Sequence, residues 1–517
     1  MRSGSYACNL FSPLNEKAMN TSKQIKWGAV LSYLSLTINI ITGLLYTPWM
    51  VASIGESQYG LYTLANSVIT LFLVDFGLSS ATGRYLSKYN AEGDHARAEQ
   101  FLGMVYKLYL IIDAIILMIL LGVFFFMDRI FLKLTPVELE QFRVVFAISA
   151  IFSVVNFPFV TFNGILTAFE KFVPLKIADL LYRVCNIGFT VIALMLGYGL
   201  YALVTVHAVV GLFVLVFKYG IIRKWVPLKP DFRNTDKRMY KEVFGFSIWV
   251  TVSNLASRLV FNITPAILGI VANSAAIAVF GIVSTIEGYA YNITTAINGM
   301  FMPKISRIVA AKNSETDLNP LFLSVGKFQY ILNGLILAGF TVVGKRFITL
   351  WMGPNFSYAY GGILLVLFPG LFYNALQIAD TTMVVMNKVK MTAKVSVLTG
   401  IVNVCLSFLL SQRLGVLGSC TAICVAYLFR DILLIIIYHR ELPLNIPRFV
   451  RECYLKLCIP ILTTVVLGAA LNQYIPDGGW GIFLFKAGVT AVIYLLMTLI
   501  FALDKRERHR ILCWLKR

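Results

Sequence analysis

Long apolar segments recur along the whole chain and constrain its fold more than any other feature. Each is about 20 residues long, which is the length that an α-helix needs to cross a lipid bilayer. Only 14% of the residues are charged, whereas a soluble protein carries roughly 25%. Backbone polar groups in lipid must find partners within their own segment, so segments of this length are expected to be helical. The sequence therefore predicts an all-α polytopic membrane protein.

We predict about fourteen transmembrane helices from these segments. Prolines inside them, such as Pro158 and Pro369, are tolerated where neighbouring helices satisfy the freed backbone groups. The polar N-terminal stretch has no apolar core, so it is not expected to be a cleaved signal peptide. The spans are placed at residues 28–53, 58–80, 103–126, 144–168, 175–197, 200–221, 244–271, 275–302, 321–344, 359–386, 391–411, 414–438, 452–473 and 480–503.

The basic residues gather on one side of the predicted spans. If the N-terminus is cytoplasmic, most of the 45 Lys and Arg residues lie in cytoplasmic loops and tails, or in the helix turns next to them. This distribution satisfies the positive-inside rule, and an odd number of spans would scramble it. It also accounts for the net charge of +20 without a nucleic-acid partner, because anionic membrane lipids attract positive charge at that face. Both termini are expected to be cytoplasmic.

The first six spans resemble spans seven to twelve. When the first half of the sequence is aligned with the second at one offset, Tyr109 matches Tyr330. At a slightly shorter offset, Lys171 matches Lys388. Because six spans is an even number, the two copies cross the membrane in the same direction. Such repeats are related by an axis along the membrane normal, and their natural binding site is the cleft between the halves.

The repeat divides the chain into six parts. These are a cytoplasmic tail at 1–27, a six-helix bundle at 28–222, a cytoplasmic linker at 223–243, a second six-helix bundle at 244–440, two additional transmembrane helices at 441–503 and a basic cytoplasmic tail at 504–517.

A family resemblance is carried by the stretch "GESQYGLYTLANSVITLFLVDFGLSSATGRYLSKYNAEGD". Its echo in the second half, "AVFGIVSTIEGYAYNITTAINGMFMPKISRIVAAKNSE", and the later "YGLYALVTVHAV" carry it as well. The chain resembles polysaccharide or O-antigen flippases of the Wzx type, whose superfamily also holds multidrug and toxic compound extruders and lipid II flippases. The likeness covers spans 1–12, by pattern and topology.

The resemblance implies a fold and a function. The fold is that of the multidrug and toxic compound extruders, with two six-helix bundles around a central cavity. The function is alternating access that moves a polyprenyl-diphosphate-linked oligosaccharide, a repeat unit of O-antigen, capsule or exopolysaccharide, from the inner to the outer leaflet. The expected location is the bacterial inner membrane. Membrane lipids, the glycan polymerase and other assembly proteins are candidate partners.

Arg258 lies deep in the seventh span, within "NLASRLVFNITPAILGIVAN". A guanidinium at the centre of a bilayer costs at least ~2.5–3.5 kcal/mol, so it must face water or a partner. Asn254 and Asn262 flank it at i−4 and i+4, which gives the helix one polar face. Glu287 and Tyr291 share a polar face of the eighth span at a similar depth. The two faces predict the wall of a hydrated cavity.

Two interpretations of Arg258 and Glu287 remain open. In the first, they form a permanent ion pair that locks the seventh span to the eighth. In the second, Arg258 binds the diphosphate or an acidic sugar, and Glu287 is its resting partner or a proton site. A guanidinium suits that task because its planar fork binds two oxygens at once.

Two further arginines lie deep in spans and complete the substrate-binding candidates. Arg183 follows Asp179 by four residues, so an ion pair within the helix is expected. Arg430 is followed by Asp431, but neighbours in sequence point about 100° apart on a helix and do not pair directly. Arg430 either extends to the inner membrane surface or faces the cavity.

Buried acids are the candidates for coupling transport to a proton or another ion. Besides Glu287, we single out Asp113, about ten residues into the third span, and Asp380, near the inner end of the tenth. Carrying one charge through 100 mV is worth about 2.3 kcal/mol, so antiport is a candidate energy source. Asp380 has the structural alternative of closing the inner end of its span.

The sequence lacks the residue patterns that other classes of function require. No G-x-x-x-x-G-K-[ST] loop, metal-ligand spacing or nucleophile with a visible base occurs in the sequence, so we expect no enzyme activity, metal or cofactor. A glycan polymerase or ligase would be expected to carry one large outer loop, and the outer loops here are short. A cation-coupled multidrug exporter is the closer alternative. The extra two spans and the deep arginines, which would repel a cationic drug, favour an anionic lipid-linked substrate.

Overall fold

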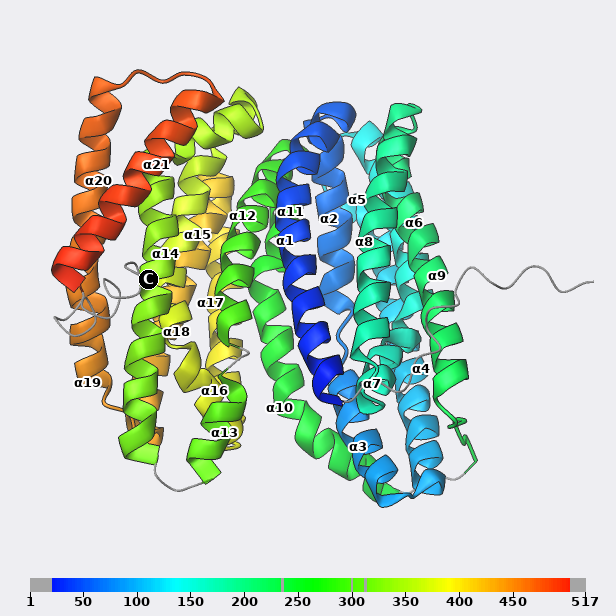
Figure 1. Cartoon of the computed structure of the whole chain (residues 1–517). Helices are drawn as coiled ribbons and strands as arrows, with labels where there is room; N and C mark the ends of the chain where they lie inside the picture. Colours follow the sequence, from blue (N-terminus) through cyan, green and yellow to red (C-terminus); the bar gives the residue numbers. More distant parts are fainter. Residues whose placement is uncertain (1–20, 234–236, 299–300, 311–313, 503–517) are drawn as a thin grey trace, which may run out of the picture.

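Figure 1 shows the computed structural model of the chain, which describes residues 21–233, 237–298, 301–310 and 314–502. Every regular element in these ranges is a helix. The helices of residues 21–225 form one group, and those of residues 237–502 form a second group beside it (Figure 1). The predicted all-α polytopic fold is therefore confirmed. Most of the two predicted cytoplasmic tails lies outside the described residues. The words inner and outer below follow the orientation that the basic residues predict.

The first group, which we call the N-terminal bundle, contains nine α-helices and one 3-10 turn. They are α1 (Thr21–Ile54), α2 (Glu56–Phe72), α3 (Leu78–Glu92), α4 (His95–Phe125), α5 (Met127–Ile130), α6 (Pro136–Asn156), η2 (Phe157–Val160), α7 (Thr161–Ala168), α8 (Phe172–Met195) and α9 (Gly199–Trp225).

The second group, the C-terminal bundle, holds the remaining described helices. They are α10 (Lys237–Phe261), α11 (Ile263–Val271), α12 (Ser274–Asn298), α13 (Met302–Ala310), α14 (Ser314–Trp351), η3 (Pro354–Phe356), α15 (Ala359–Ala375), α16 (Gln377–Val385), α17 (Val389–Leu414), α18 (Val416–Glu441), α19 (Ile446–Phe449), η4 (Val450–Leu455), α20 (Lys456–Tyr474), α21 (Trp480–Met497) and η5 (Thr498–Ala502).

Twelve helices of the described chain are long and apolar enough to cross a membrane, or thirteen if α15 and α16 form one bent span. Each overlaps one predicted span. The fourteenth prediction, 58–80, fails the same test because α2 has 17 residues and ends at Phe72. The backbone then takes positive φ at Phe76 and Gly77 before α3 begins. A conformation of that kind stops an α-helix, and hydropathy does not reveal it.

Two helices are interrupted at equivalent places in the two bundles. Helix α6 passes through η2 into α7, and α15 meets α16 at a bend of 51°. The turns that follow use the left-handed backbone region at Glu170 (φ 56°) and Asn387 (φ 58°). The next residues in the chain are Lys171 and Lys388, which the predicted repeat places on each other. These matching turns are consistent with that repeat.

The two bundles meet closely at their outer ends, where α2 packs on α12. Gly60 of α2 lies so near the Ser274 carbonyl oxygen that a β-carbon would overlap it. The Ser57 hydroxyl donates to the Glu138 carboxylate over 2.6 Å, and the Ser274 hydroxyl of the other bundle donates to the same carboxylate. We call Ser57, Glu138 and Ser274 the outer seal, because they join the outer ends of the two bundles.

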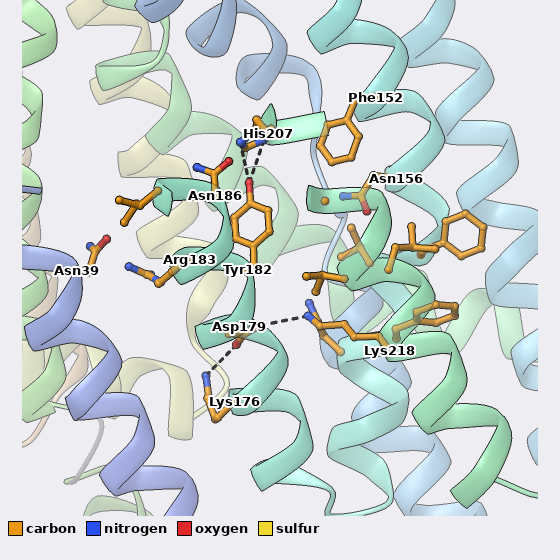
Figure 2. Close-up of a pocket in the computed structure, with 18 of the residues that line it drawn as sticks. Asn39, Phe152, Asn156, Lys176, Asp179, Tyr182, Arg183, Asn186, His207 and Lys218 are labelled. Carbon is orange, nitrogen blue, oxygen red and sulfur yellow. Dashed lines mark hydrogen bonds and ion pairs between the residues drawn. The ribbon is translucent and has the colours of Figure 1, made fainter. Parts of the chain in front are cut away.

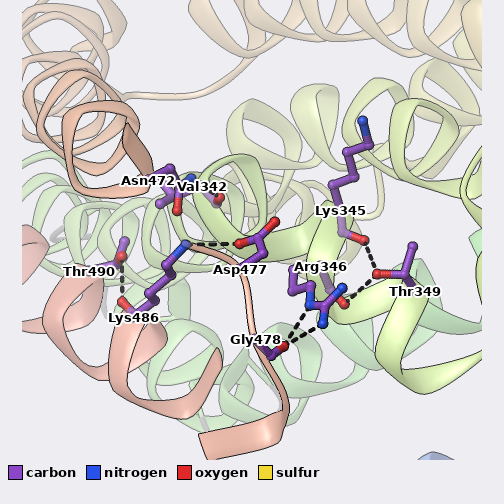
Figure 3. A network of polar contacts seen from close by, with 9 residues as sticks. All are labelled: Val342, Lys345, Arg346, Thr349, Asn472, Asp477, Gly478, Lys486 and Thr490. Carbon is purple, nitrogen blue, oxygen red and sulfur yellow. Dashed lines mark hydrogen bonds and ion pairs between the residues drawn. The ribbon is translucent and has the colours of Figure 1, made fainter. Parts of the chain in front are cut away.

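Helices α20 and α21 pack against α14, and a polar network ties the three together (Figure 3). The Lys486 ammonium lies 2.9 Å from the Asp477 carboxylate in the loop between α20 and α21. Arg346 of α14 donates from Nε to the carbonyl oxygen of Gly478 over 2.8 Å. These contacts hold the last two helices to the rest of the C-terminal bundle.

Replacing Asp477 by alanine should destabilise the protein more than replacing Lys486 by methionine. Lys486 is 2% exposed, so losing Asp477 leaves a buried ammonium without its carboxylate. The Asp477 side chain is 61% exposed, so water takes the place of Lys486 when the lysine is removed. We expect a difference on the order of 1–3 kcal/mol in the free energy of unfolding, measured by thermal unfolding in detergent. Equal losses in the two variants would contradict this assignment.

Candidate functional site

A cavity of about 250 Å³ lies in the C-terminal bundle between α10, α12, α15 and α18. We call it the C-terminal cavity. Five of the seven predicted substrate-binding residues line it, namely Arg258, Asn262, Glu287, Tyr291 and Arg430. Polar side chains on two predicted helix faces thus come together around one space.

Arg258 is half-buried and reaches across to the N-terminal bundle. Its guanidinium donates to the carbonyl oxygen of Thr70 in the last turn of α2. That carbonyl lacks its helical partner, because the Val74 amide donates to Phe72 instead. The guanidinium also interacts electrostatically with Asp75, in the break that follows α2. Arg258 therefore lies at the boundary between the bundles.

Of the two interpretations of Arg258 and Glu287, the permanent ion pair is wrong, because Arg258 contacts Thr70 instead. Glu287 lines the same cavity but forms no ion pair or hydrogen bond with any residue that the structure describes. The carbonyl of Thr70, freed by the break after α2, takes the guanidinium instead. Positive charge at a helix C-terminus is favourable because the helix dipole is negative there. Glu287 is left as a half-buried carboxylate facing the cavity.

Arg430 faces the C-terminal cavity, so it does not extend to the inner membrane surface. Its guanidinium carbon lies 4.2 Å from the ring centroid of Tyr373 and 5.4 Å from that of Tyr427. Both distances fall within the range of cation–π attraction. Its Nε finds no hydrogen-bond partner in the described chain. As predicted, no ion pair joins it to Asp431.

The three acids predicted to couple transport to an ion, Glu287, Asp113 and Asp380, have different surroundings. Asp380 accepts a hydrogen bond from the Tyr438 hydroxyl over 3.3 Å and interacts electrostatically with Arg430 behind the cavity wall. Asp113 on α4 lines neither of the cavities discussed here, and its Oδ1 is buried without a hydrogen-bond partner in the described chain. Glu287 is therefore the one coupling candidate that lines the C-terminal cavity.

Two predicted substrate-binding residues lie elsewhere. Asn254 is exposed one turn below Arg258 and does not line the C-terminal cavity. Arg183 lies in the other bundle, and its expected pair with Asp179 is wrong. Asp179 instead contacts Lys218 of α9 at 3.1 Å and Lys176 at 3.5 Å. The neighbouring helix supplies a closer cation than the i+4 position of the same helix.

Arg183 lines a second, larger space, the N-terminal cavity, of about 780 Å³ between α1, α6, α8 and α9. Figure 2 shows its polar side chains pointing inward from these helices. The Tyr182 hydroxyl lies 2.7 Å from His207 Nδ1 at one end, and the Asp179–Lys218 pair lies at the other. Polar residues spaced three or four apart on α8 were the available sequence signal for this cavity.

A chain of buried amides, which we did not predict, supports the bend between α15 and α16. Gln377 donates to Asn374 over 2.9 Å, Asn374 donates to Asn333 of α14 over 3.0 Å, and Asn333 donates to the Gln329 carbonyl oxygen over 2.8 Å. Asn374 also lines the C-terminal cavity. The network links the cavity wall to the interrupted helix.

No group of three or more His, Cys, Asp or Glu side chains with metal-site geometry occurs in the part of the chain that the structure describes.

The fold and the two polar cavities define a class of protein: a multi-pass membrane protein built from two helical bundles. Residues 27–309, more than half of the chain, match the family described as "Polysaccharide biosynthesis protein". The chain belongs to this family. Its members and the neighbours below are transporters and flippases, not enzymes.

Two curated relatives are similar over most of their length. The "Uncharacterized membrane protein EpsK" of Bacillus subtilis (strain 168) is 22% identical over 92% of this chain and 95% of its own length. The "Putative O-antigen transporter" of Shigella flexneri is 23% identical over 76% of this chain and 92% of its own length. These matches support a polysaccharide or O-antigen transporter.

Solved structures share the fold at low sequence identity. The lipid II flippase MurJ in an inward closed conformation has a TM-score of 0.69 at 13% identity, covering 92% of this chain and 98% of MurJ. An inward-facing multidrug resistance transporter of the MATE family has a TM-score of 0.67 at 12% identity. The match covers 82% of this chain and 99% of that transporter. Both share the predicted arrangement of two helical bundles.

Proposed function

We propose that this protein is a flippase that moves a polyprenyl-diphosphate-linked oligosaccharide from the inner to the outer leaflet of the bacterial inner membrane. Its membership in a polysaccharide biosynthesis family supports a glycan as cargo. The bundle arrangement shared with a lipid II flippase supports a lipid-linked one. Both termini would lie in the cytoplasm, and the glycan polymerase and other assembly proteins are candidate partners at the outer face.

One observation carries this proposal: two arginines share the C-terminal cavity, and one of them, Arg258, reaches the boundary between the bundles. Arg258 and Arg430 line it with Glu287 as the acid, so the lining side chains carry more positive than negative charge. Asp75 and Asp380 interact with the two arginines from outside this lining. A diphosphate is the anionic part of the proposed substrate, and guanidinium groups bind phosphate oxygens in pairs. Tyr291 and Asn262 supply hydrogen-bonding groups beside them.

Alternating access gives the contacts between the bundles a role. The outer seal and the packing of Gly60 on Ser274 hold the outer ends together in this conformation. The bond from Arg258 to the Thr70 carbonyl crosses the same boundary near mid-depth. We propose that an anionic head group competes with Thr70 for Arg258 and so couples substrate binding to movement of the bundles.

A cation-coupled multidrug exporter is the second candidate. It is favoured by the similarity to a multidrug resistance transporter and by Glu287, a half-buried acid in the cavity without a basic partner among the described residues. Glu287, Asp380 and Asp113 would be its ion or proton sites. In the flippase, the same acids are candidates for coupling transport to an ion gradient.

Complementation of a deletion strain separates the two functions. A strain without the protein should accumulate lipid-linked repeat units on the cytoplasmic side, and the wild-type protein should remove them and restore surface glycan. The same two strains should show equal resistance to cationic drugs. Unchanged levels of lipid-linked intermediate, together with drug sensitivity that the protein corrects, would establish the exporter instead.

A further inference from the structure

We infer that the N-terminal cavity binds an acidic sugar residue of the transported glycan. This inference rests on the proposed function and adds where the sugar lies and which charge it carries. The cavity measures about 780 Å³, within the range of about 300–1,000 Å³ that is usual for small-molecule sites. It belongs to the opposite bundle from Arg258 and Arg430, so it forms a separate site.

The charges in this cavity do not balance. Three basic side chains line it, from Lys176, Arg183 and Lys218, against the one carboxylate of Asp179. Both lysines contact that carboxylate, at 3.5 and 3.1 Å. Arg183 lies deep in its span, where a positive charge without a counter-ion is expensive, so an anion beside it lowers the energy of the protein. The structure therefore points to a negatively charged ligand.

Arg183 is the group free to hold that ligand. It projects from α8 toward Asn39 of α1, midway along the cavity (Figure 2). It forms no hydrogen bond or ion pair with any residue in the described ranges. A guanidinium offers five N–H donors in a fixed plane, and a carboxylate accepts two of them side by side.

Neutral polar groups around Arg183 match the hydroxyl groups of a sugar. Asn186, one turn further along α8, has a buried Oδ1 that accepts no hydrogen bond from the described chain. Asn39 and Asn156 add amides from two other helices, and Phe152 adds an aromatic face. A sugar hydroxyl can donate to one of these groups and accept from another, which a bare carboxylate cannot do.

The cavity also adjoins the boundary between the bundles. Gly43 of α1 lines it, and the Tyr289 hydroxyl of α12 lies against that glycine so closely that a β-carbon would overlap it. Tyr289 comes from the helix that carries Glu287 and Tyr291 of the C-terminal cavity. The α1 wall therefore separates the N-terminal cavity from the helix that lines the proposed diphosphate site, and the two sites face a common boundary.

Binding of soluble probes to the purified protein tests this inference. We expect D-glucuronate to raise the melting temperature of the wild-type protein in detergent, while equal concentrations of D-glucose or acetate at matched ionic strength do not. Arg183→Gln should weaken glucuronate binding by about 10- to 100-fold, because a hydrogen-bonded charge pair is lost. Arg223→Gln is the matched control, since Arg223 is an exposed arginine at the inner end of α9 outside the cavity, and its affinity should equal that of the wild type.

Three results would overturn the inference: no stabilisation by glucuronate, equal stabilisation by acetate, or full affinity in a folded Arg183→Gln protein. If Arg183→Gln does not fold, Arg183→Lys provides the comparison, because it keeps the charge but loses the planar guanidinium, and it should also bind glucuronate more weakly than the wild type. Export in the deletion strain is scored separately. If the wild-type protein restores export but does not bind glucuronate, only this inference is contradicted. If it binds glucuronate but does not restore export, the proposed function is contradicted.

Discussion

Replacing Arg258 by alanine is expected to abolish glycan export at normal protein levels. The substitution removes the guanidinium group that we propose binds the substrate diphosphate. Hydrogen bonds to charged groups contribute roughly 1.5–3 kcal/mol each, so export should fall at least tenfold. Arg258→Lys should keep part of the activity, because a lysine retains the charge but not the planar fork. The measurement is accumulation of lipid-linked repeat units in the complemented deletion strain.

The Arg258→Gln variant separates charge from the contact between the bundles. A glutamine amide can still donate to the Thr70 carbonyl oxygen that Arg258 contacts in the structure, but it carries no charge. If Arg258 serves the substrate, Arg258→Gln should be as inactive as Arg258→Ala. Export at the wild-type level in Arg258→Gln would show that the arginine only joins the bundles. Arg413→Ala, an exposed arginine at the end of α17, should leave export unchanged.

Joining the outer ends of the bundles by a disulfide should stop transport. Ser57 and Ser274 come from different bundles, and their hydroxyl oxygens lie 3.1 Å apart. In the variant that combines Ser57→Cys with Ser274→Cys, oxidation should link α2 to α12 and hold the outer seal shut. We expect export to fall nearly to zero after oxidation and to recover after reduction, because substrate release requires these ends to separate. The assay is surface glycan before and after treatment with a reductant.

Each single cysteine variant controls for the loss of a serine hydroxyl and for oxidation of the native cysteines. Both single variants should export with and without oxidant. Undiminished export by a fully cross-linked double variant would contradict alternating access through an outer opening at α2 and α12.

Hydropathy and helical periodicity predicted the parts of the structure that depend on single segments. The spans followed because about twenty apolar residues must form a helix in lipid. The polar faces around Arg258 and Glu287 followed because residues four apart share one side of a helix. Both kinds of inference need no knowledge of which helices are neighbours. They placed Asn262 and Tyr291 in one cavity with these two residues.

Partners that depend on packing between helices could not be predicted in this way. Arg258 contacts a backbone carbonyl, that of Thr70, which has no sequence signature and is free only because α2 ends early. Asp179 contacts Lys218 from the next helix, although Arg183 had the favourable spacing on its own helix. Spacing within one helix predicts which side chains could pair on that helix. The actual partner depends on which groups the neighbouring helices bring close.

The most direct test of the central claim uses the purified protein in proteoliposomes that contain polyprenyl-diphosphate-linked oligosaccharide in the inner leaflet. The measured quantity is the fraction of oligosaccharide that becomes accessible to an external glycosidase over time. We predict that this fraction rises with the wild-type protein and stays at the protein-free level with Arg258→Ala. An equal rise with both proteins, or none with the wild type, would contradict the account.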